Sequence, residues 1–227
     1  MSRPLLLDLF CGAGGASVGY HRAGFDVVGV DIEPQPHYPF EFIQADALAF
    51  LYELGPLPAD VIHASPPCQR YSVTRTLHDV EYPDLVYPTR RLLRNAGLPY
   101  VIENVVGAPL IDPVKLCGSS FGLGVRRHRL FESNLPLWSS QCSHREQPNP
   151  IDVTGGGPSK GPRTDGGGGR SRKPVNVGEA RTAMGIQWMT RNELNEAVPP
   201  AYTEFLGHQI RDHLDIPKLP DLEIDYR

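Results

Sequence analysis

A cysteine that directly follows two prolines is the side chain best placed for covalent chemistry in this sequence. Residues 63–72 read HASPPCQRYS, and the apolar run at 61–64 predicts a short buried strand that the prolines end. Cys68 is therefore expected on a turn at the carboxyl end of that strand, where ligands bind in open α/β sheets. A thiolate there can act as a nucleophile. The alternative use of an isolated cysteine is as a small buried hydrophobe.

A glycine-rich turn is the second feature that points to a ligand. Residues 8–20 read DLFCGAGGASVGY, so Gly12, Gly14 and Gly15 stand between a predicted strand and a predicted helix. Glycines there let the backbone approach a nucleotide-like ligand, and the following helix offers unpaired amides. The Gly-x-Gly-x-x-Gly pattern of nicotinamide binders fails, because Ser17 takes the third glycine position.

Two carboxylates follow further predicted strands. Asp31 ends the second strand, where an acid can accept hydrogen bonds from ribose hydroxyls. Asp46 follows what reads as a third strand, where it could accept a bond from an adenine amino group. Together with the glycine turn, they predict a nucleotide-containing cofactor.

The elements that position these residues follow from apolar periodicity and from helix breakers. Strands are predicted at 5–10, 25–30, 61–64 and 100–102, and helices at 16–23, 84–95, 177–184 and 201–214, with Asp84 as an N-cap. Strands that alternate with helices predict a parallel sheet. From about 138 to 173 this pattern stops, and glycine, proline and basic residues predict a mobile insert.

Composition sets the outer limits. A chain of 227 residues, 40% hydrophobic and 21% charged, is typical of one globular domain with a small appendage. The first apolar run stops at Asp8, too early for a signal peptide, and no stretch is long enough to span a bilayer. We therefore expect a cytoplasmic protein whose four cysteines are thiols. Without a Cys-x-x-Cys pair, the sequence predicts neither a disulfide nor zinc or another metal.

The net charge of −4 gives no global sign of nucleic-acid binding. Basic residues nevertheless outnumber acidic ones between Arg126 and Lys173. On charge alone, a solvated loop explains this excess.

Four segments, FCGAGG, SPPCQ, ENV and RRHRLF, occur in this order along the chain. Together they resemble the signature of the DNA cytosine-5 methyltransferases, over about residues 4–138 and 174–214. The resemblance implies an α/β, Rossmann-like fold that depends on S-adenosylmethionine, with a mostly parallel seven-stranded sheet and a small loop-rich insert. It implies a catalytic and cofactor-binding domain at 1–131, a minimal target-recognition insert at 132–174, and a C-terminal segment at 175–227 that returns to the catalytic domain.

Cytosine chemistry explains why such an enzyme needs these residue types. Carbon 5 is a poor nucleophile, and addition of the Cys68 thiolate to carbon 6 converts the ring into an enamine that can attack a methyl group. Protonation of N3 assists this addition, and Glu103 matches the family's acid; burial would raise its pKa. Asn104 is expected to brace the turn that carries Cys68.

Arg127 and Arg129 match the family's arginine pair, and the second resembles a donor to the cytosine O2. Val125 stands where the family usually has glutamine, which removes one supporting hydrogen bond.

The resemblance also implies a cofactor pocket. VGEARTAMG resembles the family's ninth motif, and NEAVPPAYTEFLGHQI resembles the tenth, which closes this pocket. Glu196 stands where the family commonly has asparagine, which we interpret as neutral drift. The implied pocket residues are Phe10, Gly12, Gly14, Gly15, Asp31, Ile32, Asp46, Ala47, Pro66 and Glu196.

Double-stranded DNA is the implied partner, and its target cytosine must leave the helix to reach Cys68. Residues 70–83 are expected to close over the flipped base. The short insert can neutralise phosphates but has little room to read bases, so relaxed or very short sequence specificity is expected. Trp138 is expected to pack at the base of the insert. The expected DNA contacts are Gln69, Arg70, Arg75, Arg163, Arg170, Arg172 and Lys173.

Three alternatives remain open at this point. One is a tRNA cytosine-5 methyltransferase of the branch that shares Pro-Pro-Cys-Gln, although its Cys-Phe-Thr signature is absent. Another is a cytosine-5 alkyltransferase with a modified S-adenosylmethionine, and the third is a non-catalytic DNA-binding relic. The chain is expected to be a monomer, and its small size suits a phage or restriction-modification enzyme.

Overall fold

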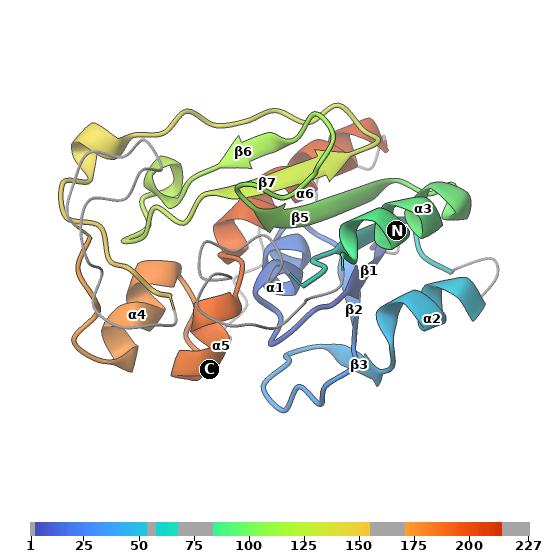
Figure 1. The fold of residues 1–227 in the computed structure, drawn as a ribbon, viewed down its shortest axis with the longest axis horizontal. Coiled ribbons are helices and arrows are strands. Elements are labelled where there is room, and N and C mark those ends of the chain that lie inside the picture. Colours follow the sequence, from blue (N-terminus) through green and yellow to red (C-terminus); the bar gives the residue numbers. More distant parts are fainter. Residues whose placement is uncertain (1–2, 54–57, 68–83, 155–170, 215–227) are drawn as a thin grey trace.

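A seven-stranded sheet forms the centre of the computed structural model, which describes residues 3–53, 58–67, 84–154 and 171–214 (Figure 1). The strand order is β3-β2-β1-β4-β5-β7-β6. Strands β1 to β5 run parallel, whereas β7 is antiparallel to both β5 and β6. The strands are β1 (Leu5–Leu9), β2 (Asp26–Asp31), β3 (Glu41–Gln44), β4 (Val61–Ala64), β5 (Tyr100–Val105), β6 (Val114–Leu116) and β7 (Arg129–Ser133).

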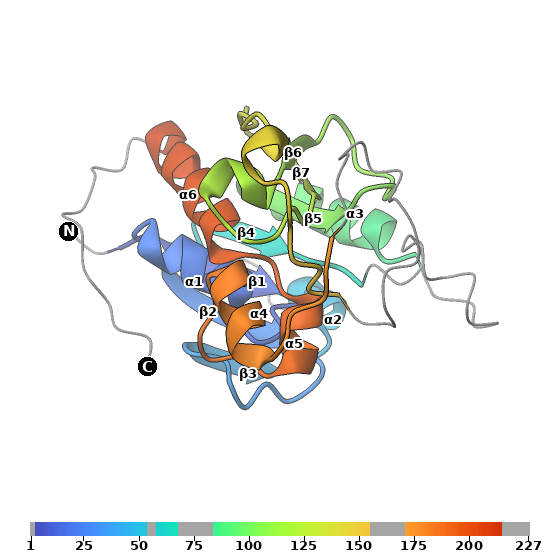
Figure 2. The same ribbon diagram turned by 90° about the vertical axis from the view of Figure 1, so that its left-hand side faces the viewer.

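Helices cover both faces of the sheet (Figure 2). Alternate residues of β1 point to opposite faces. Leu6 packs in the core under α1 and α6, and Leu7 and Leu9 pack in the core under α2 and α3. The helices are α1 (Gly15–Arg22), α2 (Ala47–Glu53), α3 (Val86–Ala96), α4 (Val177–Met184), α5 (Arg191–Glu196) and α6 (Pro200–His213).

A third apolar cluster joins α4 and α5 to the sheet edge. Ala180 and Met184 of α4 and Leu194 of α5 pack with Val125 and with Val153. These two helices therefore bury the side chain of Val125.

The mostly parallel α/β sheet confirms the predicted fold class, with small differences at the element ends. The first strand stops at Leu9 because Phe10 takes a positive φ of 57°. The predicted helix at 84–95 runs from Val86 to Ala96, and the Asp84 carboxylate accepts the amide of Val86 at 3.1 Å from just outside it. The helix predicted at 177–184 has those bounds.

One packing prediction is wrong. Trp138 does not pack at the base of the insert, because its side chain is 65% exposed. Its backbone amide donates to Gln209 Oε1 of α6 at 2.7 Å. The backbone, rather than the ring, ties this segment to the core.

None of the helices in the described ranges is both long and apolar enough to cross a membrane.

Candidate active site

The strand order reverses between β1 and β4, which places a crevice at the carboxyl ends of these two strands. The glycine turn leaves β1 there, and Ser65 and Pro66 leave β4 beside it. The glycine turn and the turn that leads to Cys68 therefore leave neighbouring strands at the carboxyl end of the sheet.

The glycine turn takes backbone conformations that favour glycine. Gly12 and Gly14 have φ angles of 49° and 82°, and α1 begins at Gly15. A Cβ atom at Gly12 would meet no other atom within 4 Å, whereas one at Gly14 would approach Pro39 Cδ to 2.8 Å. The turn is therefore open at Gly12 and closely covered at Gly14.

The two predicted cofactor acids hold backbone amides. Asp31 accepts the amide of Gly12 through Oδ2 at 2.9 Å and that of Glu33 through Oδ1 at 3.0 Å. Asp46 Oδ1 accepts the amides of Leu48 and Ala49 at the start of α2. Asp31 thus fixes the glycine turn at the end of β2.

Glu103 is a buried carboxyl group near the carboxyl end of β5. Arg129 Nε lies 3.0 Å from its Oε1, and both side chains are largely buried. Burial raises the pKa of Glu103, while Arg129, a hydrogen bond from Ser65 and the charge of Arg127 lower it in part. Oε1 has no aligned hydrogen bond within the described part of the chain. A raised pKa and an unsatisfied oxygen suit a group that exchanges a proton with a ligand.

Asn104 reaches the turn at the end of β4. Its Nδ2 donates to the carbonyl of Pro66 at 2.9 Å, and its Oδ1 accepts the amide of Val105. Pro66 precedes Cys68 by two residues. Glu103 and Asn104 are thus neighbouring residues of β5. Glu103 is the buried acid, and Asn104 holds the backbone that leads to Cys68.

Arg127 binds backbone carbonyls of two distant segments. Its guanidinium donates to Val153 O and to Asn195 O, each at 2.6 Å, and its backbone φ is 35°. These contacts join the segment before β7 to the insert and to α5.

Residues 5–108 match the model of the family described as C-5 cytosine-specific DNA methylase. Over this region, which is just under half of the chain, the protein is similar to that family.

Two curated proteins that are similar to this chain are named type II methyltransferases. The chain is 32% identical over 124 residues to Type II methyltransferase M.XorII of Xanthomonas oryzae pv. oryzae, across 47% of this chain and 29% of that protein. It is 28% identical over 158 residues to Type II methyltransferase M.AquIA of a Picosynechococcus species, across 55% of this chain and 63% of the relative. The matches thus span less than two thirds of either relative.

Solved structures extend the likeness of fold to almost the whole chain. A proposed DNA modification methyltransferase encoded within an E. coli prophage superposes with a TM-score of 0.62 at 17% identity, over 93% of this chain and 99% of that one. The Dnmt2 methyltransferase of S. pombe gives a TM-score of 0.60 at 12% identity, over 95% and 100%.

The structure also places the two departures from the family pattern. Val125 is buried in the cluster with α4 and α5, and its carbonyl accepts Gln147 Nε2 at 3.2 Å, next to a 2.6 Å bond from the same nitrogen to Leu123 O. An apolar side chain thus suits position 125 in this chain. Glu196 is exposed at the end of α5.

Of the remaining predicted cofactor residues, Ile32 is exposed, whereas Ala47 and Pro66 are buried. Cys68, Gln69, Arg70, Arg75, Arg163 and Arg170 lie outside the described residues, as do residues 215–227 of the predicted C-terminal segment. The predicted closing loop at 70–83 also lies outside them.

Arg172 and Lys173, predicted to contact DNA, bind acids of their own chain. Arg172 pairs with Glu179, and Lys173 Nζ lies 3.3 Å from Asp152 Oδ2. The backbone of Arg172 also forms an isolated parallel β-bridge with Ile151. These contacts join the middle of the insert, at residues 151–152, to its C-terminal end.

Sequence reasoning missed a buried chain of hydrogen bonds that ends at Glu103. Tyr20 Oη lies 3.0 Å from His63 Nδ1, and His63 Nε2 lies 3.0 Å from Ser65 Oγ, which bonds to Glu103. Burial lowers the pKa of His63 to about 3, so the imidazole is neutral at pH 7. A polar residue in the otherwise apolar strand 61–64 was the available signal.

A second missed group lies under the glycine turn. Asp8 is fully buried on β1 and accepts a hydrogen bond from Ser17, whose hydroxyl lies 2.9 Å from Tyr38 Oη. Burial raises the pKa of Asp8 to about 7. Ser17, which breaks the nicotinamide pattern, is therefore a link between β1 and the segment that covers Gly14.

Proposed function

We propose that this chain transfers a methyl group from S-adenosylmethionine to carbon 5 of a flipped cytosine in DNA. The observation that carries the proposal is the arrangement at the end of β5, in a chain whose residues 5–108 match the DNA methylase family. A buried acid, Glu103, is paired with Arg129, and the adjacent Asn104 holds the backbone that leads to Cys68. The acid and the arginine therefore lie beside the backbone that leads to the proposed nucleophile.

The glycine turn fits the proposed cofactor. The space next to Gly12 that a side chain would fill is open, and the amides at the start of α1 follow directly. Asp31 holds the turn through one carboxylate oxygen while retaining lone pairs for ribose hydroxyls. When bound, S-adenosylmethionine supplies an electrophilic methyl group.

The chain's own residues prepare the base. The Cys68 thiolate adds to carbon 6 while Glu103, in its acid form, gives a proton to N3, and the electron pair reaches carbon 5. Arg129 donates to the cytosine O2 and keeps its charge. After methyl transfer, solvent water takes the proton from carbon 5 and the Cys68 thiolate leaves carbon 6, which restores the aromatic ring. Glu103 then regains its proton from N3.

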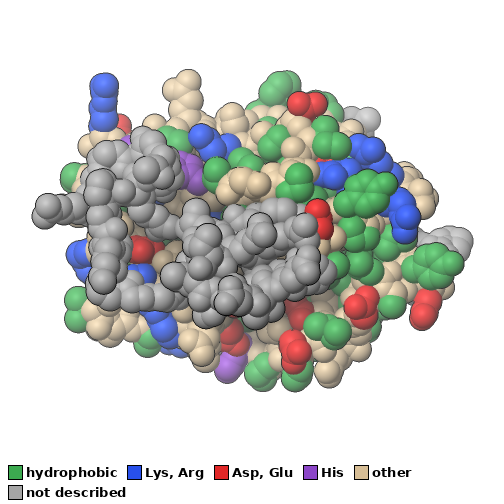
Figure 3. Space-filling view, in the orientation of Figure 1, with side chains coloured by type: hydrophobic (Ala, Val, Ile, Leu, Met, Phe, Trp, Pro, Cys, Tyr) green, Lys and Arg blue, Asp and Glu red, His purple; other side chains and the backbone are tan. Residues whose placement is uncertain are grey.

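Duplex DNA is the proposed substrate, in a short or relaxed sequence context. On the face drawn in Figure 3, the described basic side chains are interspersed with acidic ones rather than gathered in one patch. Phosphate contacts by the basic residues of the insert and by residues 69–75 would supply affinity that falls with salt.

The test is direct measurement of product. Purified chain is incubated with duplex DNA and methyl-labelled S-adenosylmethionine, and the digested nucleosides are measured by mass spectrometry. We expect labelled 5-methyldeoxycytidine with the wild type and none with Cys68→Ala. A duplex with 5-fluorocytosine should trap a denaturant-resistant complex with the wild type only, because fluorine cannot leave carbon 5 as a proton does.

The same digestion separates the alternatives. Label found in the cytidine of tRNA, with none in DNA, would replace the DNA proposal by the tRNA one. Unmodified DNA and RNA, with no trapped complex, would leave the fold without this activity. Equal product from Cys68→Ala would remove the cysteine from the mechanism.

A further inference from the structure

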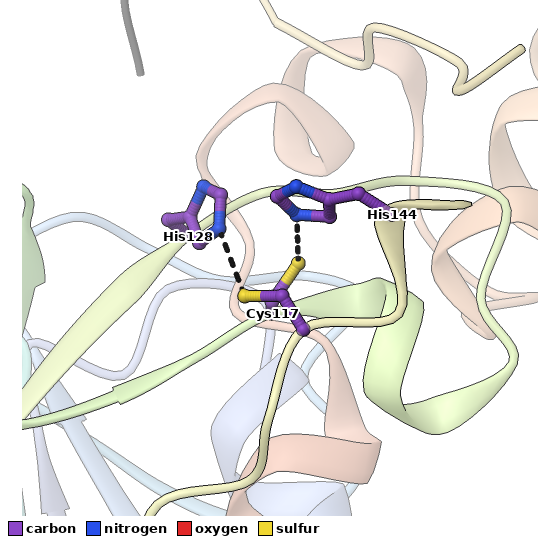
Figure 4. A group of neighbouring side chains, drawn as sticks. Cys117, His128 and His144 are labelled. Atoms are coloured by element: carbon purple, nitrogen blue, oxygen red, sulfur yellow. Dashed lines mark hydrogen bonds between the residues drawn. The ribbon is translucent and has the colours of Figure 1, made fainter. Parts of the chain in front are cut away.

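Four side chains with metal-binding atoms converge at the edge of the sheet formed by β6 and β7. Cys117, His128, Cys142 and His144 each offer one ligand atom, and these four atoms lie within 4.8 Å of one another. Figure 4 shows how Cys117, His128 and His144 converge. Cys117 is buried and Cys142 is exposed, so the cluster lies near the surface. It is separate from the proposed catalytic groups and does not depend on the proposed function.

The distances match a tetrahedral site. Zinc bonds of about 2.3 Å to sulfur and about 2.0–2.1 Å to nitrogen give sulfur–nitrogen edges of about 3.5–3.6 Å. Cys117 Sγ lies 3.2 Å from His144 Nε2, and Cys142 Sγ lies 3.5 Å from His128 Nε2. The same distances fit two thiol–imidazole hydrogen bonds, but those alone would not require the two pairs to share one centre.

Contacts around the cluster bring its segments together. The Ser143 amide donates to Ser119 Oγ at 3.1 Å, and that hydroxyl lies 3.1 Å from Cys117 Sγ, to which it can donate. Gly118 donates to Arg126 O at 2.7 Å and lies so near Val125 O that no Cβ would fit. A hydroxyl directed at a ligand sulfur is typical of the surroundings of a metal-bound thiolate.

We propose that Cys117, His128, Cys142 and His144 bind one structural zinc ion. Two thiolates and two imidazoles are the donor set of closed, four-coordinate zinc sites, in which no position remains for water. The sequence predicted no metal because it has no Cys-x-x-Cys pair, yet Cys142 and His144 are close in sequence and the fold adds Cys117 and His128.

The ion would fix the segment that presents the paired arginines. His128 lies between Arg127, whose φ is 35°, and Arg129, which pairs with Glu103. Cys142 and His144 belong to the first part of the insert, which follows β7. Zinc would thus join the root of the insert to the start of β7, directly beside the proposed base-contacting residue.

Metal content of the full chain, purified without a polyhistidine tag, tests the proposal. After dialysis against buffer with traces of zinc, elemental analysis should find one zinc per chain. The double variant Cys142→Ser, His144→Ala should lose most of it. Cys68→Ser and His208→Ala are the controls, because they remove a cysteine and a histidine outside the cluster. Both variants should retain one zinc per chain.

Cobalt substitution gives a readout that does not depend on the variants folding. Wild-type chain refolded with Co²⁺ alone should show the visible bands of a tetrahedral thiolate site, and added zinc should abolish them. Octahedral cobalt bands, or zinc that is absent from the wild type or fully kept by the double variant, would overturn the proposal. A Cys117–Cys142 disulfide found by mass spectrometry in protein purified under reducing conditions would also overturn it.

Discussion

Glu103 is subject to opposing influences, and their balance makes its acid form available. Burial raises its pKa, whereas Arg129 and the hydrogen bond from Ser65 favour the charged carboxylate. Because the proposed reaction needs the protonated form, activity should decline as pH rises through this pKa.

Replacement of Ser65 by alanine should therefore move the alkaline limb of the pH–rate profile to higher pH, since loss of that hydrogen bond disfavours the carboxylate. Methyl transfer to DNA across a pH series measures this.

Glu103→Gln should lower the rate by about 10²- to 10⁴-fold at every pH. The exposed Glu53→Gln is the matched control. An alkaline limb that moves to lower pH, or a Glu103→Gln variant as active as Glu53→Gln, would contradict the assignment.

Single residues were predictable where their surroundings in sequence were specific. Glu103 and Asn104 stand in an ENV segment at the end of an apolar strand, so their position at the ligand edge followed. His63 and Asp8 were missed, because an isolated polar residue in a strand does not reveal its partner. Those partners, Tyr20 and Ser17, both lie on α1.

The contact between α1 and α6 is the element-scale feature that supports the glycine turn. Thr203 of α6 donates to Ala16 O of α1 at 2.7 Å, and a Cβ at Gly19 would overlap Thr203 and the carbonyl of Pro200. The two helices therefore approach as closely as they do only because residue 19 has no side chain.

Gly19→Ala should destabilise the protein by about 1–3 kcal/mol through overpacking, and should also weaken S-adenosylmethionine binding because α1 begins at the glycine turn. Urea unfolding and calorimetric titration measure the two effects. Gly178→Ala in α4, where the nearest atom would be Asn176 Oδ1 at 3.2 Å, is the control and should be near neutral or stabilising. Equal stability of the two variants would show that α6 can move away without cost.

Helices and parallel strands were predictable because their periodicity is local. The pairing of β7 between β5 and β6 was not, since it depends on residues distant in sequence. The proposed zinc site arises from the same pairing, because that pairing brings Cys117, just after the end of β6, next to His128, just before the start of β7. Spacing along the chain therefore carried no sign of it.

At the scale of the whole molecule, two buried groups make stability depend on pH in opposite directions. The pKa of Asp8 is raised from 3.8 to about 7, so the folded state holds a proton that the unfolded state has lost, and stability falls as pH rises from about 4 to 7. The pKa of His63 is lowered from 6.5 to about 3, so stability falls as pH drops below 6.5. Between about 4 and 6.5 the two slopes oppose each other.

Asp8→Asn removes one of these slopes. The unfolding free energy of the Asp8→Asn variant minus that of the wild type should increase as pH rises from about 4 to 7, by up to about 1.4 kcal/mol per pH unit. Above pH 7 this difference should level off. Chemical denaturation at a series of pH values measures the difference. Asp212→Asn, an exposed change of equal charge, should give a flat difference. A flat difference for Asp8→Asn as well would mean that Asp8 is ionised in the folded protein.

The contacts that flank residues 155–170 have a consequence for how this protein can diversify. The Ile151–Arg172 bridge and the Lys173–Asp152 pair hold residues 151–154 against 171–173. Whatever sequence joins them enters and leaves at one fixed place, so its length and composition can change without altering the register of the sheet. The intervening stretch 155–170 is therefore a natural site for exchange between related enzymes, and the place where an engineer would graft a foreign recognition segment.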